Sequence, residues 1–380
     1  MDVHHSPAAV STAVLTEIAK AAVAHDRDAS FPHDSLAALQ RAGLLGLTVP
    51  ARLGGGAAGL GRAGDAVAAV GGACASTALV FAMQLLHQRR VADSGEFAPS
   101  VSDRVGRAAV ERGELINALR VEPALGTPAR GGLPETVARR TADGFCISGR
   151  KIYSTGAPGL ARLLVWARTD DATPLVGSFL VPARAPGVRI EESWDHLGLR
   201  ASGSHDVVLE DVSIPADHAG RLAPVAEWAR ADPTTAAWNV VLIGAVYTGV
   251  ARAARDWIVR FLHERRPANL GASLATLPRM QEAVGAIEER LAVNAALLDA
   301  AAQAVDLGTP HPPLTLNLFK TTLAENAVRA VEQAVALAGN HALSRQNPLE
   351  RHLRDVLCAR IHTPQIDTAH IAAGRAALGL

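Results

Sequence analysis

The chain has 380 residues, of which 49% are hydrophobic and 19% are charged, with 37 Lys and Arg against 37 Asp and Glu. That length suits two or three structural units, and the balanced charge gives no electrostatic reason to expect nucleic acid or a membrane surface as a partner. The three cysteines, Cys74, Cys146 and Cys358, are far apart in sequence, so we expect neither a disulfide framework nor a metal site.

The first twenty residues contain an acid, lack a basic stretch, and place apolar residues at helical spacing. This pattern predicts an amphipathic helix and not a signal peptide. Because no 18 apolar residues run together, we expect no membrane-spanning helix and a cytoplasmic protein.

Residues 8–113 carry apolar side chains at three-to-four spacing, interrupted by Pro32, by Gly43 and by the glycines at 54–56. One helix is predicted over residues 34–42. Asp34 there suits the positive N-terminal end of a helix, and Gly43 suits its C-terminal stop.

Between residues 115 and about 215 the period changes to short, alternating or β-branched runs separated by Gly, Pro and Asp turns. Five strands are predicted, within residues 114–120, 145–156, 162–168, 176–181 and 205–214. Because no helical stretch separates them, we expect an antiparallel β unit and not a Rossmann-like domain.

After Pro215 long helical periods return over residues 234–265, 277–305 and 314–338, followed by two shorter helices. Helices of this length favour a bundle that assembles oligomers through its outer faces. The predicted fold is mostly α with a central antiparallel β domain, divided as residues 1–114, 115–220 and 221–380.

An all-α, all-β, all-α order resembles the acyl-CoA dehydrogenase superfamily, and local strings support the resemblance. VEPALGT resembles the family's T-E-P-x-x-G-S loop, GRKIYSTGA its G-x-K-x-W-I-T-N segment, and ALAGN…RD its Q-x-x-G-G-x-G…R-D segment. Two further matches, FPHDSLAALQRAGLLGLTVPARLGG and WDHLGLRASGSHDVVLEDVSIP, complete five in the right order. The resemblance implies a helical domain, a β-barrel-like domain and a four-helix bundle.

The resemblance also implies a flavin cofactor, FAD, with FMN as the alternative. By the match, Ser154 and Thr155 would meet the N5 side of the flavin ring, Tyr153 would flank the ring, and Glu122 and Thr127 would lie on the flavin loop. Plain strand-end hydroxyls that cap a turn are the other interpretation of Ser154 and Thr155. Val121 replaces a hydroxyl that usually bonds the ring in the family.

Three further residues resemble those that hold the cofactor diphosphate. Arg265 stands where the family's arginine reaches the diphosphate of a neighbouring subunit, a contact that suits a guanidinium. Gly339 and Asn340 resemble the glycine turn at the pyrophosphate, where the backbone comes close. Arg354 and Asp355 are interpreted as an internal salt bridge.

The family's catalytic Glu is missing. On one family pattern His362 and Thr363 stand where Tyr and Glu belong, and on the other Asn239 stands at the Glu position. A His after R-D resembles the flavin monooxygenases of the superfamily, the dibenzothiophene monooxygenase type among them. His362 and, on an apolar helix, His87 are therefore the candidate catalytic residues.

Three functions remain open at this point. The favoured one is a monooxygenase or oxidase that acts on a small molecule with oxygen and flavin reduced by a separate flavin reductase. The second is an acyl-CoA dehydrogenase with a displaced base, which would pass electrons to an electron-transfer flavoprotein. The third is a non-catalytic flavin-binding or assembly subunit. In each case we expect a homotetramer or homodimer.

Overall fold

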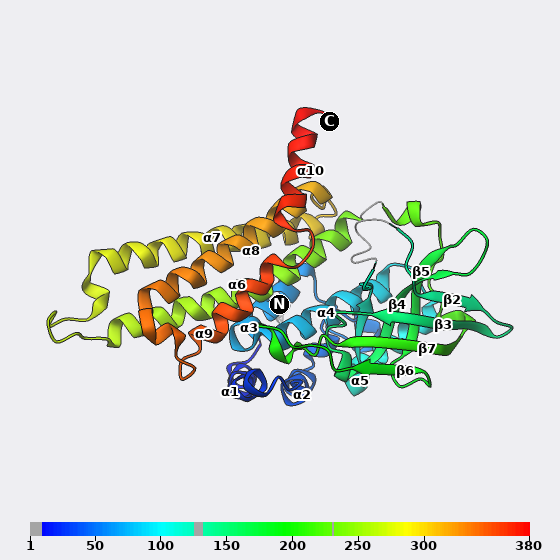
Figure 1. Cartoon of the computed structure of the whole chain (residues 1–380), viewed down its shortest axis with the longest axis horizontal. Coiled ribbons are helices and arrows are strands. Elements are labelled where there is room, and N and C mark those ends of the chain that lie inside the picture. The colour runs from blue at the N-terminus through cyan, green and yellow to red at the C-terminus, as the bar shows by residue number, and fades with distance from the viewer. Residues whose placement is uncertain (1–9, 125–131, 230–231) are drawn as a thin grey trace, which may run out of the picture.

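The computed structural model describes residues 10–124, 132–229 and 232–380. Helices at both ends of the chain lie against a sheet formed by its middle third (Figure 1). One continuous cluster of buried apolar side chains joins both helical parts to a face of the sheet. The predicted α, then β, then α order is thus confirmed.

The N-terminal part holds five helices: α1 (Thr12–Asp28), α2 (His33–Arg41), α3 (Leu60–Ala73), α4 (Ala75–Asp93) and α5 (Pro99–Arg112). Gly43, at φ 71°, adopts the left-handed conformation just after α2, as the predicted stop requires. Most of α4 is buried, because it packs against α3, α5, α6 and the first strand. α4 therefore lies between the sheet and α6, and its side chains can contact both.

The described residues of the middle part form seven strands: β1 (Leu115–Leu119), β2 (Val137–Arg140), β3 (Gly144–Lys151), β4 (Leu160–Thr169), β5 (Val176–Pro182), β6 (Val188–Glu191) and β7 (Asp206–Pro215). Their order is β1-β4-β2-β3-β7-β6, with β5 paired to β4. All five predicted strands form. β2 and β6 were missed because four residues are too few to display an alternating pattern.

The sheet is mixed, which corrects the expectation of an antiparallel unit. β1 and β2 both run parallel to β4, whereas the other four pairs are antiparallel. Parallel neighbours need a long connection. Residues 120–159, which include the β2–β3 hairpin, provide it between β1 and β4.

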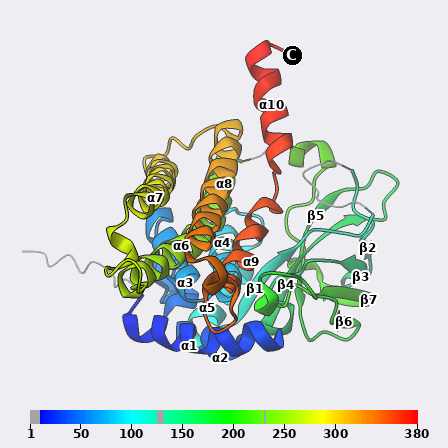
Figure 2. The same ribbon diagram turned by 60° about the vertical axis from the view of Figure 1, so that its left-hand side comes forward.

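The C-terminal part holds α6 (Pro233–Glu264), α7 (Pro278–Asp306), α8 (Pro313–Ala338), α9 (Leu349–Leu357) and α10 (Ile366–Leu378). The three long helices each begin with proline, whose fixed φ suits the first helical position. They start and end within one residue of the predicted bounds. In Figure 2, α1 and α2 lie beneath the long helices, and the sheet lies on the side opposite α7.

Among the described residues, α6 is the one helix that is long and apolar enough, by length and composition only, to cross a membrane. Its most apolar 18-residue window has a mean hydropathy of 1.3, and 78% of that window is buried inside the protein. Because α6 packs against α3, α4, α7, α8 and α9, its apolarity is that of a core helix.

Candidate active site

A group of hydroxyls lies just beyond the carboxyl end of β3. The Ser154 side chain is buried, and its Oγ has no hydrogen-bond partner among the described residues. Thr155 Oγ1 lies 3.0 Å from Ser204 Oγ, which in turn lies 2.8 Å from Ser202 Oγ. The backbone N–H of Ser154 donates to the carbonyl of His205 at 3.0 Å, so this turn is held against the start of β7.

His87 reaches the same region from α4. It is 7% exposed, and its Nδ1 has no hydrogen-bond partner within the described ranges. Burial lowers the pKa of His87 to about 3, helped by the charges of Arg90 and Arg120 and opposed by the nearby amide of Asn117. Asn117, on β1, donates to the carbonyl of Thr155 at 2.8 Å. The imidazole of His87 is therefore uncharged at neutral pH. Asn117 links it to the cluster of serine and threonine hydroxyls at Thr155.

Aromatic side chains cover the outer side of this turn. Tyr153 is 56% exposed and has a φ of 56°, a left-handed conformation that few non-glycine residues adopt. Its ring stands edge-on to Trp194 and His196, at 6.3 and 6.1 Å between centroids. Trp194 and His196 stack on each other at 3.5 Å. Strained backbone of this kind gathers at ligand sites, and here it presents an aromatic wall beside the hydroxyls.

Glu122 lies inside the β domain and not at this wall. Its carboxylate lies 2.5 Å from Lys151 Nζ and accepts hydrogen bonds from the backbone N–H of Glu135 and from both N–H and hydroxyl of Thr136. Burial alone would raise the pKa of Glu122, but Lys151 and these hydrogen bonds outweigh it and lower the pKa. The Glu122 side chain thus holds β3 in place. Thr127 lies outside the described residues.

His362 lies between the short helix η10 (Cys358–Arg360) and α10. Its Nε2 is 2.6 Å from the hydroxyl of Tyr247, a buried residue in the middle of α6. Lys320, on α8, donates to the carbonyls of His362 and, at 3.0 Å, of Pro364. Burial and then the charge of Lys320 lower the pKa of His362 to about 4, so this imidazole is also uncharged at neutral pH.

Arg354 and Asp355 do not pair with each other, which corrects the expectation. Arg354 forms ion pairs with Asp26 of α1 at 2.6 Å and with Glu350 at 2.8 Å. Asp355 is buried and accepts a hydrogen bond from the backbone N–H of Leu199 at 2.7 Å. The two residues therefore fasten α9 to α1 and to the β domain.

This junction lies between the two groups of candidate residues, the aromatic wall and the Tyr247–His362 pair. The carbonyl of Leu199 accepts a hydrogen bond from the indole of Trp194 at 3.0 Å, on the aromatic wall. On the other side, α9 packs against α6, the helix that carries Tyr247, the partner of His362. The aromatic wall and the Tyr247–His362 pair thus flank one seam between the β domain and the bundle.

The three expected diphosphate residues lie elsewhere. Arg265 follows the C-terminal end of α6, and Gly339 and Asn340 begin the short helix η9 (Gly339–Leu343). An α-helix rises about 1.5 Å per residue, so the 32 residues of α6 separate its two ends by roughly 48 Å. Figure 1 shows this end of α6 far from the sheet. Within one chain these residues and Thr155 do not meet.

A hollow of about 310 Å³ lies beside that end of α6. Its lining includes Phe261, whose ring stacks on Trp257 at 5.2 Å and lies the same distance from His341 of η9. Aromatic rings therefore lie close in sequence to the three expected residues.

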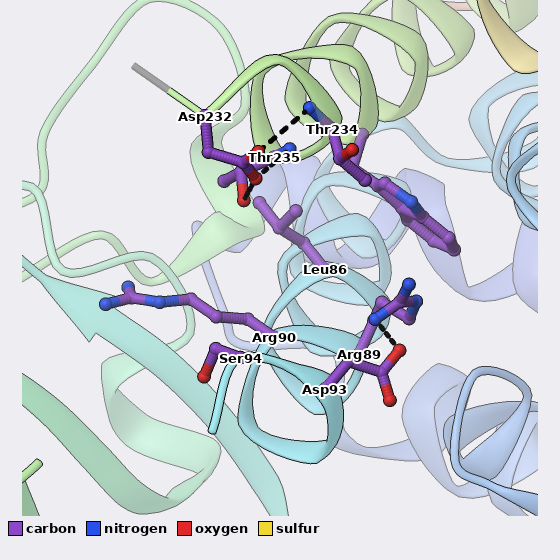
Figure 3. Close-up of a pocket in the computed structure, with 9 residues that line it drawn as sticks. Leu86, Arg89, Arg90, Asp93, Ser94, Asp232, Thr234 and Thr235 are labelled. Atoms are coloured by element: carbon purple, nitrogen blue, oxygen red, sulfur yellow. Dashed lines mark hydrogen bonds and ion pairs between the residues drawn. The ribbon is translucent and has the colours of Figure 1, made fainter. Parts of the chain in front are cut away.

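A second pocket, of about 200 Å³, lies where the end of α4 meets the start of α6. Figure 3 shows Arg89 paired with Asp93 on one side and Asp232 bonded to the backbone of Thr234 and Thr235 on the other. Arg90, one turn after His87, also lines the pocket. The pocket is thus next to the helix that carries the candidate His87.

Sequence reasoning missed Tyr247 and Asn117. Tyr247 is one of only two tyrosines in the chain, and it interrupts a long apolar run of α6 with a hydroxyl. A buried tyrosine needs a hydrogen-bond partner, and that need was the available signal. Asn117 gave a similar signal within the apolar string LINAL.

The residues at the seam fit a flavin ring, which needs hydrogen-bonding groups along one edge and an apolar or aromatic wall. Ser154 Oγ and His87 Nδ1 are buried without partners in the described part of the chain. Leaving such a group unsatisfied costs about 1–3 kcal/mol. A ligand with acceptors and donors at this place would satisfy both, and Tyr153 offers the aromatic wall.

Comparisons with known proteins match the whole length. Family models for the N-terminal, middle and C-terminal domains of acyl-CoA dehydrogenases match residues 7–95, 120–212 and 241–365. A putative acyl-CoA dehydrogenase of Bacillus subtilis, YdbM, is 32% identical over 94% of this chain and 92% of its own length. The L-evernosamine nitrososynthase of a Micromonospora strain is also 32% identical, over 97% and 88%.

A solved structure agrees with these relatives. KijD3 in complex with FMN and dTDP-3-amino-2,3,6-trideoxy-4-keto-3-methyl-D-glucose has a TM-score of 0.83 at 30% identity. The match covers 97% of this chain and 91% of that one.

Proposed function

The chain belongs to the acyl-CoA dehydrogenase superfamily of flavin-dependent oxidoreductases, and we propose that it is a member that uses reduced flavin and oxygen, as a monooxygenase or oxidase. Its substrate would be a small molecule and not an acyl-CoA thioester. A separate flavin reductase would supply the reduced flavin.

The residues at the family's base positions carry this proposal. Desaturation needs a carboxylate to take the α-proton. At the two family positions this chain has Thr363 and Asn239, which have no carboxylate. Beside Thr363 stands His362, an uncharged imidazole held by Tyr247. Such a group suits hydrogen bonding to a developing oxyanion.

Two buried carboxylates, Glu122 and Asp355, are already engaged. Glu122 is bonded to Lys151 and Thr136, and Asp355 accepts from the backbone of Leu199. Using either as a base would break a contact that holds the fold together. This supports the oxygen-using function over a dehydrogenase with a displaced base.

The relatives support both sides, and the site residues support the oxygen-using function. YdbM is described as a putative acyl-CoA dehydrogenase. The L-evernosamine nitrososynthase, by its name, makes a nitroso group on an amino sugar, and the new N–O bond needs an oxidant. We infer that amines, including amino sugars, belong in any substrate screen.

In this proposal each residue at the seam has a role. Flavin, as FAD or FMN, would supply hydride acceptance and, once reduced, reaction with oxygen. Ser154 and Thr155 would hydrogen-bond the ring edge and Tyr153 would flank it. His87 and His362 would present neutral imidazoles to the substrate.

Anaerobic titration of the flavin-loaded protein with a panel of acyl-CoAs tests the proposal. We expect no bleaching of the flavin by any acyl-CoA. After chemical reduction and admission of oxygen, an amine panel that includes dTDP-amino sugars should yield an oxygenated product or stimulate oxygen consumption.

Bleaching by an acyl-CoA in the absence of oxygen would contradict the proposal and favour the dehydrogenase. Thr363→Glu is the companion variant, because it places a carboxylate at the family position. If bleaching appears only in Thr363→Glu, the missing carboxylate is what separates this chain from a dehydrogenase.

A further inference from the structure

Tyr247 is a buried tyrosine to which the resemblance assigned no role, and it contacts the ring of His362. We propose that Tyr247 is a positioning residue that holds His362 in the tautomer with its proton on Nδ1, so that the imidazole offers an N–H donor and not a base. This inference rests on the proposed function, in which His362 faces the substrate.

The geometry of the pair is that of a strong hydrogen bond. Tyr247 Oη lies 2.6 Å from His362 Nε2, within the usual range for a hydroxyl bond, and the ring centroids are 5.6 Å apart. Tyr247 is 1% exposed, and a buried phenol keeps its partner because water cannot replace it. The ring of His362 is thus fixed at one nitrogen by a rigid helix.

The surroundings decide which partner donates. Burial raises the pKa of Tyr247 well above its usual value, helped by Cys358 of η10 and Asp355 of α9. The phenol therefore keeps its proton. On the other side Lys320 of α8, with burial, lowers the pKa of His362. The imidazole is therefore neutral. The buried hydroxyl of Tyr247 has no other hydrogen-bond partner among the described residues, so its proton is directed at Nε2 and the tyrosine O–H donates.

A neutral imidazole carries one proton, so a ring that accepts at Nε2 has its N–H at Nδ1. Such a ring has no free lone pair for taking a proton from a substrate. Its one fixed donor, the N–H at Nδ1, can bind an oxygen atom that becomes negatively charged during the reaction. Lys320 reinforces the arrangement, because its bonds to the carbonyls of His362 and Pro364 fix the backbone of His362 and of the turn that follows it.

Solid-state ¹⁵N NMR of the flavin-loaded, full-length protein with labelled histidine tests the tautomer directly. The signals of His362 are assigned by their loss in His362→Asn. We expect a protonated shift at Nδ1 and an unprotonated shift at Nε2 at neutral pH. In Tyr247→Phe the population should move toward the Nε2-protonated form. An Nε2-protonated ring in the wild type, or an unchanged spectrum in Tyr247→Phe, would overturn the inference.

Thr248→Val is the matched control. Thr248 is the next residue of α6, is buried, and loses with this change a hydroxyl that accepts from Asn294 at 3.1 Å, away from His362. A spectral change at His362 in this variant as large as in Tyr247→Phe would mean that disturbance of α6, and not the phenol bond, moves the tautomer.

Turnover gives a second, independent measurement. Tyr247→Phe should lower kcat by about 2- to 10-fold, the equivalent of one neutral hydrogen bond, with KM and flavin affinity retained. His362→Asn keeps an amide N–H near the place of Nδ1 and should retain part of the activity. Tyr247→Phe added to His362→Asn should then cost nothing further, and a full additive loss would count against positioning.

The two proposals fail in distinguishable ways. If an acyl-CoA bleaches the flavin, the oxygen-using function falls, but the NMR spectrum still reports the tautomer. If oxygen-dependent turnover is found and the spectrum shows the proton on Nε2, only the role of Tyr247 falls.

Discussion

Ser154 and His87 each bury a polar atom that the described residues leave without a partner. A buried unsatisfied group weakens the fold of the empty protein and strengthens the binding of a ligand that satisfies it. The two effects have opposite signs and can be separated in one variant.

Ser154→Ala should bind flavin more weakly, by about 0.5–1.5 kcal/mol, while the flavin-free protein is as stable as the wild type or more stable. Flavin affinity by fluorescence and unfolding of the flavin-free protein by urea give the two numbers. Ser148→Ala serves as the control, since that exposed hydroxyl bonds to Asp211 on the far end of β7. Unchanged flavin affinity in Ser154→Ala would return this residue to a turn-capping role.

A second prediction at this scale concerns acid. Burial lowers the pKa of His87 and of His352 to about 3 in the folded state, whereas both take up protons near pH 6.5 when unfolded. Their stabilising contribution is therefore complete above pH 6.5 and is lost as the pH falls toward 3. Asp355 has the opposite sign, because burial raises its pKa to about 6, and so it offsets part of the loss below pH 6.

His352→Gln should make stability less sensitive to acid, by about 1.4 kcal/mol per pH unit between pH 6 and 4, because one proton fewer is taken up on unfolding. Urea unfolding at several pH values measures the slope. His33→Gln is the control, since this side chain lies at the surface. Equal slopes in wild type and His352→Gln would contradict the assigned pKa.

The sequence predicted which residues gather at the seam better than it predicted their contacts. Ser154 and Thr155 were found because a short string resembles a family motif. The Tyr247–His362 bond was not, because it joins residues 115 positions apart through the packing of α6 and η10. Glu122 was matched by string to a cofactor loop, whereas its direction depends on Lys151, a neighbour that only folding brings close.

Among the elements, the three long helices were predicted to within a residue because helix signals are local, and each begins with a proline, Pro233, Pro278 or Pro313. The pairing of β1 with β4 was not predicted, since strand neighbours depend on how the intervening chain folds. The seam between the β domain and α9 likewise depends on close packing between segments that are far apart in the sequence. At Gly198 an added Cβ would lie 2.1 Å from the carbonyl oxygen of Arg354.

Gly198→Ala should therefore force the turn away from α9 and destabilise the protein by about 1–3 kcal/mol. Gly285→Ala is the matched control: Gly285 lies within α7, and an added Cβ there meets nothing within 4 Å. This change should stabilise by about 0.5–1 kcal/mol, since alanine favours a helix. Denaturant midpoints compare the two, and equal midpoints would contradict the close packing of the seam.

For the whole molecule, the distance between the ends of α6 bears on assembly. As the family resemblance implies, we expect Arg265 of a second copy to complete the cofactor site, and the Arg265 of the same chain lies a helix length away. The projecting helix α10 is a second indication that the chain assembles with other copies. Ile371 and Leu378 of this helix, and Leu380 just beyond it, are more than half exposed. An isolated helix of 13 residues is marginal in water. We expect a dimer or tetramer in light scattering, and a monomer would contradict this.

Arg265→Ala should weaken FAD binding by about 1.5–3 kcal/mol, the range of a charged hydrogen bond, and leave FMN binding unchanged. FMN lacks the adenylate half that Arg265 would hold. Arg266→Ala is the control, since Arg266 is the exposed neighbour. An equal loss for FMN, or no loss for FAD, would contradict the placement.

The length of α6 then couples cofactor binding to the association of the chains. A cofactor that touches Thr155 of one chain and Arg265 of another adds its binding free energy to the association of the chains, because it binds the assembled form and not the separated one. Stripping FAD should loosen the oligomer, and diluting the oligomer should release FAD. The apparent affinity for the cofactor would then depend on protein concentration.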